Sequence, residues 1–457
     1  MSRLVMPTRI LVVGSGGREH ALAWKFGAEP GVNEIVGAPG SDAMAAEPRV
    51  RRVAGLDPLD PAAVVALARE RAVELVVIGP EAPLAAGVAD ALVGAGIPVF
   101  GPTADAARIE TSKAFCHEIA EAAGVPMARA ATFDSAPPAI AHARAEAARS
   151  GDGVVVKADG LAAGKGVVVC ENGDEAADAV EALFRAGAGP VVVEERLRGP
   201  EASVIAVCDG QRAIGLPAAR DHKRLLDGDV GPNTGGMGAY SPLGDLSDED
   251  VEHVVATVHR PILAELARRG TPFRGFLYAG LMLTERGAYL LECNARLGDP
   301  EAQVILPRLA SPLGPLLLAA ARGDLPSDAS GRLAVLPVAS LGIVLAAAGY
   351  PEAPRRGDEI AGLAEASATR ALVFHAGTKR TADGGFETDG GRVLTVVGQG
   401  LDLAGARVAA ERAADLVTWA GMQRRRDIGM RALEAGAAAA GVATNAATPA
   451  TPAGAGR

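Results

Sequence analysis

The stretch YLLECNARLGDPE, residues 289–301, carries the most chemically capable side chains of the sequence. Glu292, Asn294 and Arg296 recur at every second position, which places them on one face of a strand. A carboxylate and an amide oxygen at this spacing suit Mg²⁺ shared with phosphate oxygens. The guanidinium on the same face could hold a substrate carboxylate as a fork. The alternative is a strand end whose charges form ordinary ion pairs.

A glycine-rich stretch, ADGLAAGKG, lies between the apolar runs VVVK and VVV. Lys157 ends the first run, and an ammonium group buried there needs an anionic partner. Lys165 stands between Gly164 and Gly166, so loop and lysine could fold over a polyphosphate. This is not a Walker A loop, because a glycine and a strand follow the lysine instead of Ser or Thr and a helix. We predict a nucleotide site here, with a plain hairpin turn as the alternative.

The run VVVEERLRGPEAS is an apolar strand that ends in two carboxylates. Glu194 and Glu195 could form a hinge beside a nucleotide base, with Glu201 placed for a ribose hydroxyl. A solvated run of charges is the equally plain alternative.

Charged residues and then glycines crowd the stretch RDHKRLLDGDVGPNTGGMGAYSP. The charged part includes Asp221 and Lys223, and the glycines include Gly235 and Gly236. Such glycine density favours a backbone that closely approaches a ligand. A mobile surface loop with solvated charges is the alternative.

The first glycine loop, VVGSGGREH, follows a strand and opens a helix. The N–H groups of Ser15, Gly16 and Gly17 could bind an anion at the helix N-terminus. A dinucleotide is disfavoured, because Glu19 replaces the third glycine of GxGxxG and the second strand ends in VGAPG, without an acidic residue for the ribose. A substrate phosphate fits better, and a tight turn without a ligand is the alternative.

The elements that must position these residues fall into three groups. The N-terminal group alternates strands and helices, which predicts a parallel sheet with ligands at the carboxyl ends of its strands. The expected strands are residues 9–13, 34–36, 73–78 and 98–100, and the expected helices are 21–26, 61–71 and 88–93. We therefore predict an α/β domain over residues 1–108.

From Ala104 the pattern changes to a mixture of helices and antiparallel strands. Two strands joined by a short glycine loop, 154–157 and 167–169, are typical of a hairpin. We predict an α+β domain over residues 109–332 and a small β-rich domain over 333–433, with strands at 340–347, 374–379 and 392–398 before a helix at 403–416. The composition of residues 434–457, almost all Ala, Gly, Thr and Pro, predicts a disordered tail.

The bulk properties exclude several classes of function. A length of 457 residues predicts about three domains, and a net charge of −10 argues against nucleic acid as a main partner. The four cysteines are scattered without metal-binding spacing, which predicts reduced thiols. There is neither a signal-peptide pattern nor an apolar run long enough for a membrane span, so we expect a cytoplasmic protein without a membrane partner.

Taken together and in this order, these stretches resemble the phosphoribosylamine–glycine ligases, ATP-grasp enzymes of purine biosynthesis. The resemblance covers about residues 9–430 and is carried most specifically by DHKR, GPNTGGMGAYSP and GDPE. It implies an N-terminal parallel-sheet domain, a central ATP-grasp domain and a small β-rich C-terminal domain. It also implies the ligation of glycine to 5-phosphoribosylamine through glycyl phosphate, with ATP as co-substrate and Mg²⁺ or Mn²⁺ as metal, by a monomer or weak homodimer.

The resemblance implies roles residue by residue. ATP would be bound by Lys113, Lys157, Gly164, Lys165, Gly166, Glu194, Glu195 and Glu201, and the metal by Glu292 and Asn294. The substrates would be bound by Gly16, Gly17, Arg18, Glu19, Pro80, Glu81, Asp221, Lys223, Gly235, Gly236 and Arg296. Lys165, Asp221 and Arg296 would be the catalytic residues.

Three rival functions remain open from the sequence. The nearest is another ATP-grasp carboxylate–amine ligase or carboxylase with a different acid or amine. A dinucleotide-dependent oxidoreductase would use the first glycine loop. A catalytically silent nucleotide-binding protein would not need Glu292, Asn294 and Lys165 together.

Overall fold

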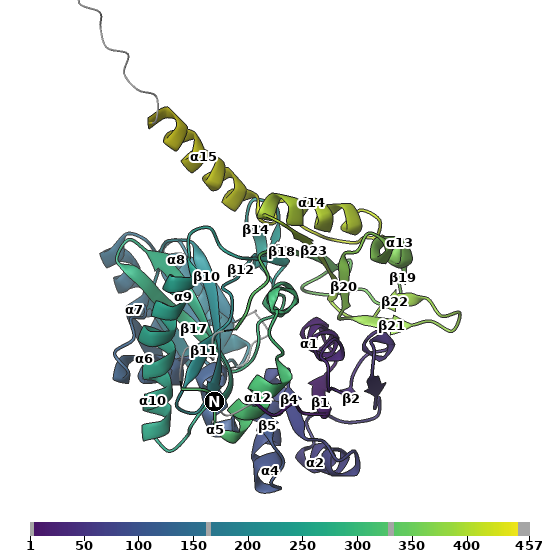
Figure 1. Ribbon diagram of the computed structural model, residues 1–457. Helices are drawn as coiled ribbons and strands as arrows, with labels where there is room; N and C mark the ends of the chain where they lie inside the picture. Colours follow the sequence, from purple (N-terminus) through teal and green to yellow (C-terminus); the bar gives the residue numbers. More distant parts are fainter. Residues whose placement is uncertain (1–3, 161–165, 328–332, 447–457) are drawn as a thin grey trace, which may run out of the picture.

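The computed structural model of the protein describes residues 4–160, 166–327 and 333–446 (Figure 1). Its N-terminal part is the predicted parallel sheet, with strand order β3-β2-β1-β4-β5. The strands are β1 (Arg9–Gly14), β2 (Glu34–Pro39), β3 (Val50–Arg52), β4 (Leu75–Ile78) and β5 (Val99–Phe100). The helices are α1 (Gly17–Gly27), α2 (Pro61–Glu70), α3 (Glu81–Ala85) and α4 (Val88–Gly94). Because every strand pair is parallel, the loops after β1 and β4 leave the sheet at the same edge.

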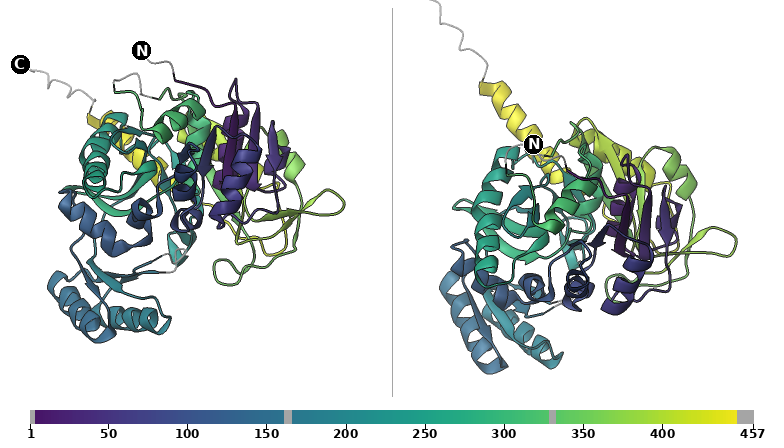
Figure 2. Two further views of the ribbon diagram at one scale, coloured as in Figure 1. Left: turned by 90° about the horizontal axis from the view of Figure 1, so that it is seen from below. Right: turned by 60° about the horizontal axis from the view of Figure 1, so that its bottom comes forward.

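A second module forms the outer wall of the central region. Its sheet has the order β6-β9-β7-β8, and α7 and α8 pack on it over a small core of their own. The strands are β6 (Ala130–Phe133), β7 (Val154–Ala158), β8 (Val167–Cys170) and β9 (Val191–Glu195), and the helices are α7 (Ala136–Ser150) and α8 (Gly173–Arg185). The β7–β8 pair is antiparallel, as the hairpin prediction required. This module projects from the body of the molecule (Figure 2).

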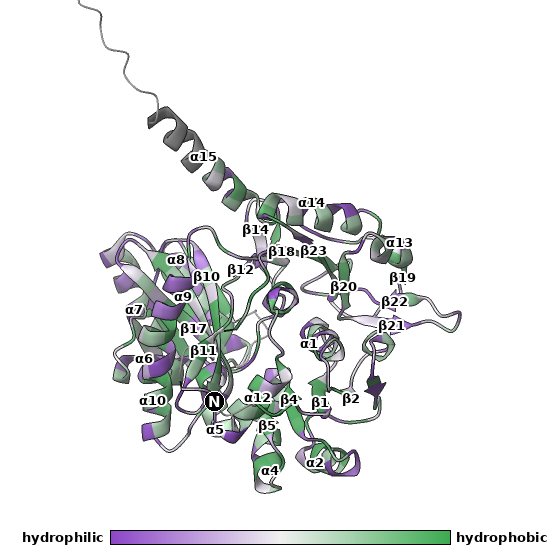
Figure 3. Cartoon of the chain, in the orientation of Figure 1, coloured by the Kyte–Doolittle hydropathy of each residue, from purple (hydrophilic) through white to green (hydrophobic). Residues whose placement is uncertain are grey.

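The body of the central region is a second antiparallel sheet of order β11-β10-β16-β17. Its strands are β10 (Glu201–Asp209), β11 (Ala213–Gly215), β16 (Arg274–Thr284) and β17 (Gly287–Asn294). The helices around it are α5 (Ala104–Thr111), α6 (Lys113–Ala122), α9 (Asp248–Val254), the π-helical turn η2 (Val255–His259), α10 (Arg260–Arg268), α11 (Glu301–Ile305), the 3₁₀ turn η3 (Leu306–Arg308) and α12 (Gly314–Arg322). Figure 3 shows the strands of this sheet largely in the hydrophobic colour, whereas the helices around it carry both hydrophobic and hydrophilic residues.

The third sheet joins distant parts of the chain in the order β12-β15-β18-β23-β20. Its strands are β12 (Arg220–Asp221), β15 (Gly238–Ser241), β18 (Ala339–Ala346), β20 (Leu372–His375) and β23 (Arg392–Gly400). Helices α13 (Leu363–Ala368) and α14 (Leu403–Ala414), a small sheet of β19 (Glu359–Ile360), β21 (Thr378–Arg380) and β22 (Phe386–Thr388), and the hairpin β13 (Arg224–Leu226)–β14 (Val230–Asn233) complete this region. The three-domain α/β and α+β architecture predicted from the sequence is confirmed, but this sheet runs across the expected boundary at residue 333, because β15 pairs with β18.

The C-terminal segment differs from the expectation. Helix α15 spans Met430–Ala446 and runs away from the body (Figure 1), so residues 434–446 are helical where a disordered tail was predicted. Alanine has the highest helix propensity of all residues, which explains how a segment of low complexity can be helical. The rest of the predicted tail, residues 447–457, lies outside the described residues.

Across the described ranges, no helix combines the length and the apolar character needed to cross a membrane.

Candidate active site

A cavity of about 1350 Å³ lies where the N-terminal sheet, the β6–β9 module, the central sheet and the third sheet meet. Most of the residues predicted to form the site line it. These are Arg18, Pro80, Glu81, Lys113, Lys157, Gly166, Glu194, Glu195, Glu201, Asp221, Lys223, Gly235, Glu292, Asn294 and Arg296. Gly16, Gly17, Glu19 and Gly236 do not line it, and Gly164 and Lys165 lie outside the described residues.

The two predicted metal ligands lie at the carboxyl end of β17. Glu292 has only long ion pairs, 3.7 Å to Lys113 and 3.9 Å to Lys223, and no hydrogen bond to its carboxylate is found among the described residues. Burial opposes its ionisation, but the charges of Lys113 and Lys223 outweigh burial and lower the pKa of Glu292 to about 2. Asn294 is buried beside it on the same strand. An ionised carboxylate and an amide oxygen, both open toward the cavity, fit a hard divalent cation.

Protein donors alone do not complete such a metal site. Within the described part of the chain, no group of three or more His, Cys, Asp and Glu side chains is arranged to hold a metal. Mg²⁺ typically keeps waters and substrate phosphates as ligands beside one or two protein oxygens. The donor set of Glu292 and Asn294 therefore fits a cation that enters with a phosphate-bearing substrate.

Lys157 has the anionic partner that its burial requires, but that partner is part of the protein. Its ammonium lies 2.7 Å from Oε2 of Glu194 and donates to the carbonyl of Leu291 at 3.1 Å. His117 on α6 lies 2.8 Å from the other oxygen of Glu194. Both oxygens of Glu194 are thus occupied, so its carboxylate orients Lys157 and has no free oxygen in this arrangement. Sequence reasoning missed His117, although it lies one helical turn beyond Lys113 and so on the same face of α6.

The DHKR stretch that begins at Asp221 contributes two ionisable side chains, Asp221 and Lys223, to the lining of the cavity. Lys223 pairs with Glu201 at 3.1 Å, and this carboxylate raises the pKa of Lys223 well above its usual value. Burial raises the pKa of Asp221 to about 7, with Lys223 opposing the shift and Glu301 and Glu201 reinforcing it. Lys223 therefore stays cationic, while Asp221 can change its charge near neutral pH.

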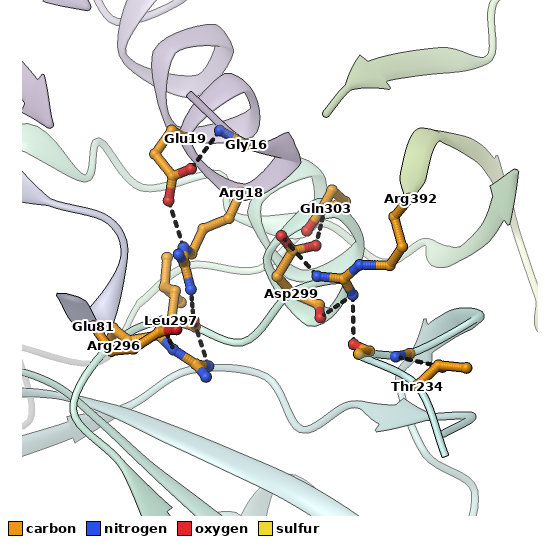
Figure 4. Close-up of polar contacts among 12 residues, drawn as sticks. Gly16, Arg18, Glu19, Glu81, Thr234, Arg296, Leu297, Asp299, Gln303 and Arg392 are labelled. Carbon is orange, nitrogen blue, oxygen red and sulfur yellow. Dashed lines mark hydrogen bonds and ion pairs between the residues drawn. The ribbon is translucent and has the colours of Figure 1, made fainter. Parts of the chain in front are cut away.

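Arg296 is clamped between two carboxylates from other elements. Its Nε lies 3.3 Å from Glu81 on α3 (Figure 4), and one terminal nitrogen lies 2.9 Å from Glu110 on α5. Its other terminal nitrogen donates to the carbonyl of Leu297 at 3.2 Å, which also accepts from Arg18 at 3.0 Å. Although burial opposes it, the two carboxylates raise the pKa of Arg296. Glu110 was not predicted, because a carboxylate within a helix gives no sequence signal of its partner.

The first glycine loop does not offer an open anion site. Glu19 accepts the N–H of Gly16 at 2.7 Å and the Nε–H of Arg18 at 2.6 Å (Figure 4). A Cβ atom on Gly79 would lie 2.1 Å from Glu19, and one on Gly14 would lie 2.7 Å from it. The glycines therefore make room for a buried glutamate that holds Arg18 at the cavity wall.

The second glycine loop approaches other parts of the chain. Arg392 on β23 donates to the carbonyls of Gly235 and Asp299, and lies 3.2 Å from the Asp299 carboxylate (Figure 4). Gly236 has a φ of +111°, and a Cβ atom there would lie 2.6 Å from Pro300. The sequence predicted that the backbone at these glycines closely approaches a ligand. In the structure it closely approaches Arg392 and Pro300 of the protein itself.

Sequence reasoning missed the C-terminal contributors to the cavity. Arg392 and Tyr350 line it, and the hydroxyl of Tyr350 accepts the N–H of Gly235 at 3.0 Å. The start of α15 also lines it, and there Arg431 pairs with Asp229 of the β13–β14 hairpin at 2.6 Å. These residues lie more than a hundred positions from their partners, so no local pattern could have found them.

Known proteins resemble this chain over nearly its whole length. Family models of the phosphoribosylglycinamide synthetase N domain, ATP-grasp (A) domain and C domain match residues 8–110, 111–302 and 340–431. A curated phosphoribosylamine–glycine ligase from Leifsonia xyli is 49% identical over 426 residues, covering 93% of this chain and 100% of its own. The same ligase from Streptomyces coelicolor is 48% identical over 427 residues, covering 93% and 99%.

Solved structures give the same relationship. The crystal structure of phosphoribosylamine–glycine ligase from Thermotoga maritima aligns with a TM-score of 0.76 at 33% identity, covering 92% of this chain and 100% of that one. A biotin carboxylase domain of Hydrogenobacter thermophilus 2-oxoglutarate carboxylase aligns with a TM-score of 0.67 at 18% identity, with 92% of both chains covered. The second likeness concerns the fold alone.

Proposed function

The chain belongs to the phosphoribosylglycinamide synthetase family, and from this premise we propose that its cavity joins glycine to 5-phosphoribosylamine. The reaction consumes ATP and gives glycinamide ribonucleotide, ADP and phosphate, a step of purine biosynthesis. One observation supports the assignment to this cavity: cationic residues and the residues proposed to bind the metal and the substrate carboxylate come from separate stretches of the chain and line the same space.

ATP lies between the β6–β9 module and the central sheet in this proposal. Lys113 and Lys157 offset charge on the transferring phosphoryl group, and Gly166 contacts the nucleotide from the start of the second strand of the hairpin. The strand end at Glu194 and Glu195 borders the adenine, with Glu201 toward the ribose. Gly164 and Lys165 keep the covering role that the sequence predicts for them.

Glu292 and Asn294 would hold Mg²⁺ or Mn²⁺, which neutralises phosphate charge and polarises the γ-phosphoryl group when it is bound. Both side chains are presented on one face of β17, so they approach the phosphates from the central sheet. The low pKa of Glu292 keeps this carboxylate ionised throughout the physiological range.

The acid and amine substrates occupy the remaining part of the cavity. We assign the carboxylate of glycine to Arg296 and the ammonium group of glycine to Asp221. Lys223 lies between these two residues and the nucleotide in this proposal. The carboxylate attacks the γ-phosphate of ATP and displaces ADP, which gives glycyl phosphate. The amine of phosphoribosylamine then attacks the carbonyl carbon of glycyl phosphate, forms the amide and displaces phosphate. Catalysis consists mainly of positioning, charge stabilisation and exclusion of water, because an exposed acyl phosphate hydrolyses.

The ribosyl phosphate is assigned to the N-terminal edge of the cavity. Arg18, Pro80 and Glu81 line it there. Gly16, Gly17 and Glu19 act through Arg18 in this proposal, because Glu19 already fills the glycine loop. Gly235 and Gly236 shape the opposite wall.

The choice of Mg²⁺ or Mn²⁺, a monomeric or weakly dimeric state, a cytoplasmic location and the absence of nucleic acid and membrane partners remain predictions of this proposal.

The test is ADP release by the purified protein with ATP, Mg²⁺, glycine and freshly generated phosphoribosylamine, leaving out one component at a time. We expect release to require both glycine and phosphoribosylamine, with the amide product detected by mass. ADP release that depends on another acid or amine would keep the ATP-dependent chemistry and overturn the substrate assignment.

A further inference from the structure

Glu110 is a buried carboxylate that contacts the two residues directly after the end of β17, Ala295 and Arg296, from a different element of the fold. It lies on α5, with 3% of its surface exposed. Its Oε2 accepts the backbone N–H of Ala295 at 2.7 Å, and its Oε1 pairs with Arg296 at 2.9 Å. Ala295 is the residue between Asn294 and Arg296, so one side chain fixes the backbone between a proposed metal ligand and a proposed substrate ligand.

The other contacts of Arg296 constrain it less. The ion pair with Glu81 is longer, at 3.3 Å, and the Glu81 side chain is 34% exposed against 4% for Glu110. Screening by water weakens an exposed pair far more than a buried one. The hydrogen bond to Leu297 is made to the neighbouring residue and moves with the strand end. Glu110 is therefore the contact that ties this guanidinium to a rigid element outside the strand.

The two contacts of Glu110 also act on different groups. Loss of the ion pair frees the guanidinium of Arg296, whereas loss of the hydrogen bond to Ala295 frees the backbone that orients Asn294. Residues that orient a ligand from behind it typically change metal affinity or activity by about 10–100-fold when they are replaced.

We propose that Glu110 is a positioning residue that aligns Arg296 with the glycine carboxylate and the Asn294 backbone with the metal. The proposal rests on the proposed function for its glycine part. Its metal part concerns Asn294 alone and can be measured without turnover.

The test compares E110Q and E110A with the matched control E29Q. Glu29 is also 3% exposed and accepts two backbone N–H groups, from Leu313 at 2.6 Å and Gly314 at 3.0 Å, but it does not line the cavity. E110Q keeps an oxygen for Ala295 and loses the charge that holds Arg296. We expect E110Q to raise the KM for glycine about 10-fold with a smaller change in kcat, and E29Q to leave the KM for glycine unchanged.

E110A loses both contacts, so it should also weaken metal-dependent nucleotide binding. We expect the Mn²⁺ concentration needed for half-maximal ADP binding, measured by calorimetry, to rise about 10-fold in E110A and to stay within twofold in E110Q and E29Q. Melting temperatures of all three variants show whether each is folded at the assay temperature.

The outcomes separate the two proposals. If the wild type shows no glycine-dependent ADP release, the proposed function is wrong, and the Mn²⁺ titration still decides whether Glu110 orients Asn294. If the wild type depends on glycine but E110Q shares the KM of E29Q, Glu110 does not position Arg296. If E110A binds Mn²⁺ and ADP like the wild type, it does not position Asn294 either.

Discussion

Glu292 and Asp221 are two buried carboxyl groups of one cavity with opposite ionisation behaviour. Both lose hydration on burial, which favours the neutral form. Glu292 lies between two lysines and has a pKa of about 2, whereas Asp221 has further carboxylates near it and a pKa of about 7. The difference between their neighbours suits Glu292 to a cation and leaves Asp221 able to exchange a proton near neutral pH.

Replacement of Glu292 tests the metal assignment. We expect E292A to lower kcat/KM about 10³-fold, because it removes the ionised metal ligand. The same loss should follow treatment of the wild type with EDTA and be reversed by Mg²⁺. Turnover of E292A near the wild-type rate at ordinary Mg²⁺ would remove this residue from the metal site.

At the scale of elements, two loops owe their shape to contacts within the protein. The loop after β1 packs around Glu19, and the loop before β15 packs around Arg392 and Pro300. In both, glycine is required where a side chain or ring from another element approaches the backbone.

Substitution of Gly236 tests the second loop. We expect G236A to lower the free energy of unfolding by at least about 2 kcal/mol, because an alanine would combine an unfavourable φ with the contact at 2.6 Å to Pro300. Activity should fall with it, since the neighbouring Gly235 lines the cavity. The control is G228A, where φ is +76° and no atom lies within 4 Å of the added Cβ atom. Its cost should be about 1 kcal/mol, and equal costs in urea unfolding would contradict the steric argument.

The π-helical turn η2 carries a pH-dependent contribution to stability. His259 is fully buried, its Nε2 lies 3.2 Å from the carbonyl of Leu277, and burial lowers its pKa to about 4. Because its folded pKa lies below the unfolded value of about 6.5, its contribution is complete above pH 6.5 and is lost as the pH falls toward 4.

We therefore expect the stability difference between wild type and H259Q to shrink by about 3 kcal/mol from pH 7 to pH 4. Urea unfolding at a series of pH values measures it. H253Q, which replaces an exposed histidine of α9, is the control. Equal pH slopes for wild type and H259Q would show that His259 does not carry this effect.

At the scale of the whole molecule, the cavity exists only where several modules meet. Arg18 and Glu81 come from α1 and α3 of the N-terminal domain, Glu292 and Arg296 from β17 and the residues directly after it, and Arg392 from the third sheet. The third sheet also contains β15, which directly follows the loop at Gly235 and pairs with β18. The loop is therefore fixed both by this strand pairing and by the hydrogen bond from Arg392 on β23. Binding sites between modules allow each substrate to contact a different wall.

Replacement of Arg392 tests whether the third sheet contributes to the function of the cavity. We expect R392A to lower kcat/KM for phosphoribosylamine 10- to 100-fold, because the loops at Gly235 and Asp299 lose their common hydrogen-bond donor. Steady-state kinetics with varied phosphoribosylamine measures the effect. R356A removes an exposed ion pair with Asp389 in the same region and should change nothing. An R392A enzyme with wild-type kinetics would show that the third sheet serves only as a scaffold.

The sequence by itself determined many of the local helices and strands and the types of side chain available to the site. Strands β1 and β4, the β7–β8 hairpin and the alternation of Glu292 and Asn294 on β17 follow from apolar periodicity and glycine positions, which depend on neighbouring residues only. Arg296 was predicted on the same strand, but it lies two residues beyond the end of β17. The confirmed family and fold class followed from specific stretches such as GPNTGGMGAYSP and GDPE.

Only the tertiary structure decided which charges meet. The pairing of Lys157 with Glu194, the filling of the first glycine loop by Glu19 and the clamp of Glu110 on Arg296 each join residues whose partners no local pattern specifies. Short strands such as β12 and β15 were missed for the same reason, since their pairing with distant strands stabilises them more than their own composition does. Local propensity determines which helices and strands form, whereas burial and charge pairing between distant residues determine which side chains meet in the cavity.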